Sequence, residues 1–145
     1  MSVSTPTRPV PRGLPSAPIL RGALLAFGIV SLLIGLFQVV DPAGFVHDIG
    51  PYGTTNEHYV RDLSTWSLSF GVVLVLGAGR PAWHVPLLTL AALQGALHLV
   101  NHLADVGAAD PASMGIVNAV ALAVVLGVLL WLLAGAVQAA QGSRS

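Results

Sequence analysis

The stretch GALLAFGIVSLLIGLFQVV, residues 22–40, decides the fold class, because it carries no charged side chain over a length that can cross a bilayer. A spanning helix needs about 20 mostly apolar residues. A secretory signal peptide has a shorter apolar region, of about 7–15 residues, that ends in small residues at a cleavage site. This run is longer and ends in Val39-Val40-Asp41-Pro42, so we expect a retained first membrane helix.

The whole chain has the composition of an integral membrane protein. Of its 145 residues, 54% are hydrophobic and 8% are charged, whereas a soluble domain usually carries about 25% charged residues. The formal net charge is zero, so there is no basic surface for nucleic acid. Cys is absent, which excludes disulfides, thiolate metal sites and thiol catalysis. We expect one membrane domain whose partner is the lipid bilayer, with a membrane protein as a further candidate partner.

Four spanning helices account for residues 19–138, and we expect them at about 19–40, 55–78, 82–104 and 113–137. The second is the least obvious, because its purely apolar part, residues 63–78, is short. Thr54 followed three positions later by Glu57 predicts a capping box and a start near Thr55. We expect residues 1–18 to form a disordered cytoplasmic tail and residues 139–145 a short cytoplasmic tail.

The distribution of charges predicts the orientation of these helices. Arg and Lys in short loops mark the cytoplasmic side of a membrane protein. There is no lysine, and one side holds Arg8, Arg12, Arg21, Arg80 and Arg144, whereas the other holds Asp41, Asp48, Glu57, Asp62, Asp105, Asp110 and Arg61. We therefore expect an all-α, integral membrane four-helix bundle with cytoplasmic N- and C-termini. The abundance of Ala, Gly, Val and Leu suggests a GC-rich bacterial genome, and hence a multi-pass protein of the bacterial cytoplasmic membrane.

Polar residues gather on one face of each of the two middle helices. At about 100° per residue, those of the third helix occupy an arc of about 100°. A charge at the bilayer centre costs about 2.5–3.5 kcal/mol, so two such faces are expected to meet each other rather than lipid. The residues are His58, Arg61, Asp62, Thr65 and Ser69 on the second helix, and Gln94, His98, Asn101, His102 and Asp105 on the third. We expect an outward-opening polar pocket above an apolar plug.

The composition of this pocket predicts a site for a divalent metal ion. His98 and His102 are four residues apart, so they lie on one helical face and can share a metal. Asp62 and Asp105 are the expected carboxylate ligands, which would give a set of two histidines plus carboxylate. A second chemistry is haem or quinone binding. In that alternative His98 or His102 faces His58 across the bundle, and Arg61 and Asn101 are further candidate cofactor-binding residues.

A purely structural role for the same side chains also stays open. Arg61 can pair with Asp105 or Asp62, and the histidines can hydrogen-bond to Asn101 or to backbone carbonyls. Such contacts between membrane helices are worth about 0.6 kcal/mol each on average. A small-ligand, transport or enzyme site is a further alternative, and the sequence does not decide whether the chain is an enzyme.

Small residues on the first two helices predict that these helices pack closely. Ser31-xxx-Gly35 and Ser67-xxx-Gly71 are small-xxx-small pairs, which allow two helix backbones to approach. We expect this contact to lie within one chain rather than between two copies.

The stretch Asn56-Glu57-His58-Tyr-Val-Arg61-Asp62, followed by Gly71 and by His98-xxx-His102 after a Pro-containing turn, resembles small four-helix bacterial membrane proteins grouped as DoxX-like. The resemblance is to actinobacterial members without an assigned activity, and it covers about residues 22–137. It implies a four-helix membrane fold. Some DoxX proteins are associated with quinone-linked oxidation of sulfur compounds or with redox stress, which implies a redox enzyme subunit as the alternative function. The leading hypothesis is an accessory membrane protein that binds a metal ion or small polar ligand.

Overall fold

The computed structural model describes residues 13–143, which form four long helices and one short one. The long helices are α1 (Ala17–Val40), α3 (Glu57–Ala78), α4 (Pro81–Ala104) and α5 (Ala112–Gly142), and each is long and apolar enough to cross a membrane. At 1.5 Å per residue they extend about 33–46 Å, at least the thickness of a hydrocarbon core. The expected all-α fold is therefore confirmed. The tail predictions for residues 1–12 and 144–145 lie outside the described residues.

The short helix α2 (Pro42–Asp48) occupies the segment that was expected to be a loop. Asp41 caps it, because its side-chain oxygen accepts a hydrogen bond from the backbone N–H of Gly44 at 2.9 Å. Pro42 sits in its first turn, where a missing N–H costs nothing. The pair Asp41-Pro42 is thus a helix start, in addition to the end of the first span.

Two other helix boundaries differ from the sequence prediction. α3 begins at Glu57, and its cap is Asn56, whose Oδ1 accepts a hydrogen bond from the N–H of Tyr59 at 3.3 Å. The predicted Thr54 cap is wrong, because Asn56 is closer to the helix and is an equally good capping residue. α5 continues to Gly142, so it extends into the segment expected to be a polar tail.

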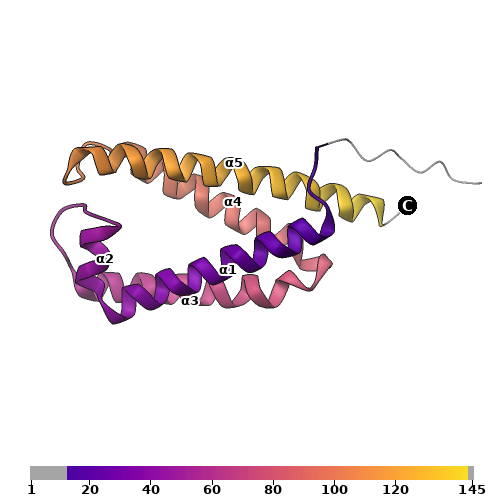
Figure 1. Ribbon diagram of the computed structural model, residues 1–145, viewed down its shortest axis with the longest axis horizontal. Helices are drawn as coiled ribbons and strands as arrows, with labels where there is room; N and C mark the ends of the chain where they lie inside the picture. The colour runs from indigo at the N-terminus through magenta and orange to yellow at the C-terminus, as the bar shows by residue number, and fades with distance from the viewer. Residues whose placement is uncertain (1–12, 144–145) are drawn as a thin grey trace, which may run out of the picture.

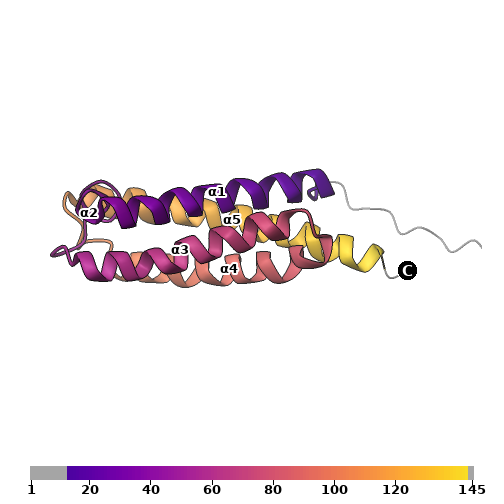
Figure 2. The ribbon, with the colours of Figure 1, turned by 90° about the horizontal axis from the view of Figure 1, so that it is seen from below.

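The long helices form two antiparallel pairs, α1 with α3 and α4 with α5 (Figure 1). Both ends of the described chain lie at one end of the bundle, which we call the termini end, and α2 lies at the other, the α2 end. The two pairs touch at the termini end and diverge toward the α2 end (Figure 1), and Figure 2 shows α1 and α3 side by side from below.

Small residues bring α1 and α3 into close contact. The hydroxyl of Ser31 donates to the carbonyl of Ser67 at 3.0 Å. A Cβ added to Gly71 would lie 2.8 Å from the carbonyl oxygen of Gly28, so the two backbones touch there. Gly35 is equally constrained, since its Cβ would lie 3.0 Å from the backbone nitrogen of Leu68. The prediction of a close contact within one chain is confirmed, and this contact fixes how α3 is rotated about its own axis.

Among residues 13–143, the core that joins the two pairs lies in the half of the bundle at the termini end. Every long helix contributes the half of its length nearest that end. The buried members are Leu20, Leu24, Leu74, Ala78, Leu87, Leu88, Ala91, Ala92, Leu129, Leu132 and Ala136. The described parts of the helices are therefore packed together in a shared core in the half at the termini end, the sealed half, and this core does not continue to the α2 end.

The termini end also holds a segment that was expected to be disordered. The indole N–H of Trp131 donates to the carbonyl of Gly13 at 2.8 Å. Pro15 is buried against α5, where a Cβ on Gly135 would overlap its ring. His84 is buried at this end, and its Nε2 lies 3.0 Å from the carbonyl oxygen of Ala78.

Candidate functional site

The segment that follows α2 crosses from one helix pair to the other at the α2 end. The backbone N–H of Asp110 donates to the carbonyl of Pro51 at 3.0 Å, and Tyr52 forms an isolated antiparallel bridge with Ala109. The side-chain amide of Asn118 on α5 donates to the carbonyl of Ile49 at 3.2 Å. The crossing segment, residues 49–52, therefore ties the diverging pairs together at the α2 end.

Tyr52 in the crossing segment begins a chain of three hydrogen-bonding side chains. Its hydroxyl oxygen lies 2.9 Å from Nδ1 of His102, and Nε2 of His102 lies 3.0 Å from Nε2 of His98. The two imidazole rings are 4.7 Å apart between centroids, as their i, i+4 spacing on α4 allows. A neutral imidazole has one N–H and one unprotonated nitrogen, so all three groups can be linked in sequence. We call Tyr52, His102 and His98 the histidine chain.

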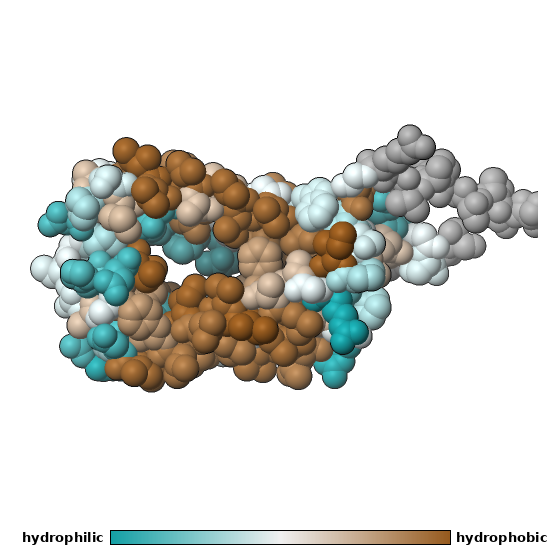
Figure 3. All heavy atoms as spheres, in the orientation of Figure 1, coloured by the Kyte–Doolittle hydropathy of each residue, from teal (hydrophilic) through white to brown (hydrophobic). Residues whose placement is uncertain are grey.

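The histidine chain faces the space between the two pairs. In the sealed half, Leu87 packs against Gly77 of α3, and Ala91 belongs to the same core. Further along α4, at about 100° per residue, the side chains on the same side of the helix as Leu87 are polar. They are Gln94, His98 and His102, which lie within an arc of about 80°. The face of α4 that packs on α3 near the termini end thus becomes polar where α3 has moved away. Figure 3 shows an opening there, with hydrophilic surface beside and behind it.

An aromatic stripe of α3 lies on the opposite side of this opening. This stripe lies on the same side of α3 as Gly77, within an arc of about 60°, and consists of Tyr59, Leu63, Trp66 and Phe70. Trp66 and Phe70 stack with their centroids 5.3 Å apart and their planes 12° from parallel, and Trp66 is 42% exposed. Trp66 lies 11 residues before Gly77 (77 − 66) and His98 lies 11 after Leu87 (98 − 87). Because the helices are antiparallel, the two side chains lie at the same level. We call the space between this stripe and the histidine chain the gap.

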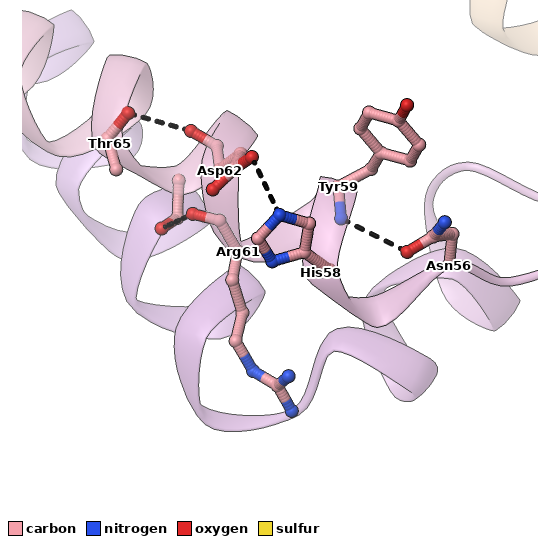
Figure 4. A network of polar contacts seen from close by, with 7 residues as sticks. Asn56, His58, Tyr59, Arg61, Asp62 and Thr65 are labelled. Carbon is pink, nitrogen blue, oxygen red and sulfur yellow. Dashed lines mark hydrogen bonds and ion pairs between the residues drawn. The ribbon is translucent and has the colours of Figure 1, made fainter.

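The polar stripe of α3 points elsewhere, so the prediction that the two polar stripes face each other is wrong. His58 and Asp62 lie 3.4 Å apart and are 80% and 62% exposed, and Arg61 pairs with Glu57 at 2.6 Å instead of with Asp62 or Asp105. In Figure 4 the Tyr59 and Arg61 side chains point in different directions from the same turn. The reason is the close contact with α1, which turns Ser67 and Gly71 inward and so directs His58 and Asp62 away from the gap.

The predicted metal and cofactor residues are therefore divided between separate places. His98 and His102 are together, but Asp62 bonds to His58 on the outward face of α3. Asp105 ends α4, with its backbone N–H donating to the carbonyl of Asn101 at 3.1 Å. Within residues 13–143 no group of three or more His, Asp or Glu side chains is placed to hold a metal ion. A haem ligated by His58 and His98 across the bundle is not assembled either, because His58 faces away from α4.

Other polar groups lie close to the α2 end without joining the histidine chain. A pocket of about 710 Å³ lies between α2 and the start of α5, and His47, Asp48 and Asp110 contribute to its lining. Nδ1 of His47 and Oδ1 of Asp48 are 2.6 Å apart and exposed. Gln38 is only 2% exposed, and its Oε1 has no hydrogen-bond partner within residues 13–143.

Sequence reasoning missed two residues of the gap. Tyr52 was not among the predicted site residues, because the path of its loop depends on pairing with residues far along the chain. Trp66 carried a usable signal. Tyr59, Leu63, Trp66 and Phe70 follow an i, i+4, i+7, i+11 pattern, which marks one face of a helix.

No protein-family model, no curated protein and no solved structure matches this chain. Its four long apolar helices indicate a multi-pass membrane protein. Within that frame, the gap is the place where polar side chains meet an accessible apolar surface.

Proposed function

We propose that this chain binds an amphipathic ligand from the bilayer in the gap between its two helix pairs. The observation that carries the proposal is the position of the histidine chain, which lies at the α2 end of an opening between membrane-spanning helices (Figure 3). Ligand sites are mostly apolar, with a few polar groups that fix orientation. Here the polar head would bond to His98 and Tyr52, and the apolar tail would extend toward the termini end along Trp66 and Phe70.

The charges around the gap define the chemistry of the head. Arg61, the arginine nearest in sequence to the aromatic stripe, pairs with Glu57 away from the gap. Recognition of phosphate normally uses Arg or Lys as a charged donor. Imidazole and phenol are neutral donors and acceptors. The gap therefore suits an uncharged head with a hydroxyl or carbonyl oxygen, as in a monoacylglycerol, better than a phosphate.

The orientation that fits this proposal places both termini in the cytoplasm of a bacterium and the histidine chain near the outer surface. The distribution of charge supports it, since Arg21 and Arg80 lie at the termini end and the six acidic residues lie toward the α2 end. An Asp48→Cys variant tests it in intact cells, because the native chain has no Cys. We expect labelling by a membrane-impermeant thiol reagent before lysis. Labelling only after lysis would reverse the orientation.

Membership of the DoxX-like group is part of the same proposal. Two stretches that carry the resemblance have defined places in the fold. Asn56 caps α3, and the motif His98-xxx-His102 supplies the two histidines of the histidine chain. The other charged residues that carry the resemblance form the exposed pairs His58–Asp62 and Glu57–Arg61 on α3. We propose that a membrane protein partner docks on this exposed face.

A quenching experiment tests ligand binding directly. A variant with Trp83→Phe and Trp131→Phe leaves Trp66 as its sole tryptophan, since the chain has three. In detergent micelles, a monoacylglycerol brominated on its acyl chain is expected to quench Trp66 fluorescence with saturation. His98→Leu is expected to remove the saturable component, because the head then loses its partner.

The control variant is Asp62→Asn, which changes the outward face of α3 and is expected to leave the saturable quenching intact. Quenching that rises in proportion to the probe, equally in all three proteins, would show partition into the micelle and would contradict the proposal. A second copy of the chain is the competing occupant of the gap, and dimeric mass by light scattering together with absence of saturable quenching would favour it.

A further inference from the structure

We infer that His98 and His102 form a two-histidine seat for a divalent metal ion of the late first row, with Cu²⁺ preferred. The inference deepens the proposed function, and it rests on that function for the role of the ion but not for its binding. Nε2 of His98 and Nε2 of His102 converge to 3.0 Å. With metal–nitrogen bonds of about 2.0–2.1 Å, this separation corresponds to an angle of about 94° at the metal.

That angle is closer to square-planar than to tetrahedral coordination. Adjacent ligands in square-planar or tetragonal coordination are about 90° apart, which is the geometry typical of Cu²⁺ and Ni²⁺, whereas structural zinc is tetrahedral. Cu²⁺ also has the highest affinity of the divalent first-row ions for a given nitrogen and oxygen site. The His98–His102 pair therefore fits Cu²⁺ better than Zn²⁺.

Tyr52 supplies the outer support that metal-binding histidines usually have. A ligating histidine almost always uses its other ring nitrogen in a hydrogen bond, which fixes the ring orientation and the tautomer. The phenol oxygen of Tyr52 lies 2.9 Å from Nδ1 of His102, and the two rings meet edge to face at 87°. His102 is thus held with its Nε2 directed at His98.

The proton balance of binding is neutral. In the metal-free pair, one Nε2 carries the proton that bridges the two rings. A metal needs both Nε2 atoms unprotonated, so this proton moves to Nδ1 of the same ring. If that ring is His102, its Nδ1–H then donates to the oxygen of Tyr52, whose own proton turns to another acceptor. No proton is released and no electron is transferred when the ion binds two neutral imidazoles.

The remaining coordination positions are open. Because no third His, Asp or Glu within residues 13–143 joins the pair, two or more positions of a bound ion would be left to water. These positions face the gap, where the proposed ligand places its oxygen. The hydroxyl or carbonyl oxygen of the ligand head could replace a water there. The ion would then raise the affinity for the head, whereas the contacts of the apolar tail do not involve the ion.

The test uses full-length protein in detergent, stripped with a chelator, loaded with CuCl₂ and desalted. We expect one Cu²⁺ retained per wild-type chain and an electron paramagnetic resonance spectrum with two nitrogen ligands. His98→Ala and His102→Ala are each expected to lose retention. Tyr52→Phe is expected to weaken Cu²⁺ binding about tenfold, as changes to such outer partners typically do.

His47→Ala is the matched control, because His47 is an exposed histidine at the same end of the molecule. It is expected to keep the full copper content. Equal copper in the wild type and in the His98→Ala/His102→Ala double variant would overturn the inference. If the variants do not fold, the wild-type spectrum still decides, since a signal without two imidazole nitrogens also overturns it. Monoacylglycerol quenching in the copper-free protein tests the proposed function separately.

Discussion

The two ends of this bundle use the same four helices in opposite ways. At the termini end, leucine and alanine side chains from all four long helices meet in one core, and Leu87 fills the space beside Gly77. At the α2 end, the same face of α4 carries His98 and His102, and His102 there contacts Tyr52 of the crossing segment. The difference shows how a small membrane protein can keep a stable fold and an accessible site. Close packing in one half fixes the helices, so the other half can remain open.

Disturbing the close contact between α1 and α3 is expected to have the largest effect. Gly71→Ala would place a Cβ 2.8 Å from the carbonyl oxygen of Gly28 and 2.9 Å from the backbone nitrogen of Leu32, so the helices must separate. We expect a loss of about 3 kcal/mol in the free energy of unfolding, measured by denaturation in mixed micelles. Gly127→Ala is the control, because its Cβ meets no described atom within 4 Å. An equal effect of both would contradict the close contact.

Removing a side chain from the sealed half is expected to have the next largest effect. Leu88 is 1% exposed in the core that joins the pairs, so Leu88→Ala should cost about 2 kcal/mol through lost packing. Leu97→Ala, on an exposed position of the same helix, should change stability by less than about 0.5 kcal/mol. Similar losses at both positions, in the same denaturation assay, would remove the contrast between the two halves.

Cutting the histidine chain at Tyr52 is expected to have a moderate effect. Tyr52→Phe removes one hydrogen bond, to His102, and should lower the free energy of unfolding by about 1 kcal/mol. It should also raise the dissociation constant for the brominated monoacylglycerol. For the stability effect the control is Tyr59→Phe, because the Tyr59 hydroxyl has no hydrogen-bond partner among the described residues. Unchanged probe binding in Tyr52→Phe would show that the crossing segment does not contribute to the site.

The outward charges of α3 are expected to matter least to stability. Arg61 and Glu57 are both about half exposed, so the free energy of their ion pair is small. We expect Arg61→Gln to change the free energy of unfolding by less than about 0.5 kcal/mol and to leave probe binding unchanged. A large loss of probe binding would mean that Arg61 contributes to the ligand site, which would contradict its position on the outward face of α3.

Hydropathy predicted the four long helices, and helix periodicity predicted which face of α4 holds its histidines. The same periodicity was misleading for α3, because this helix has both a polar stripe with His58 and Asp62 and an aromatic stripe with Tyr59 and Trp66. Which stripe faces α4 depends on the rotation that Gly71 and Ser67 impose through α1. Sequence showed those small residues, but not the direction in which they turn the helix.

The remaining error concerned the segment between α1 and α3. Asp41-Pro42 is a recognisable helix start, so the capping preferences of Asp and Pro could have predicted α2 from the sequence. The position of Tyr52 was not, because it depends on the backbone contact of Pro51 with Asp110 far along the chain. Contacts of this kind are set by the packing of complete helix pairs.

Disulfide cross-linking at two levels of the α3–α4 contact tests the central claim, because the native chain has no Cys to interfere. Two cysteines form a disulfide when their Cα atoms are within about 7 Å. We expect Gly77→Cys/Leu87→Cys to cross-link efficiently in native membranes and Trp66→Cys/His98→Cys, which lie at one level across the gap, to remain reduced. Efficient cross-linking of both pairs would mean that the helices stay together along their whole length, and there would be no gap for a ligand to enter.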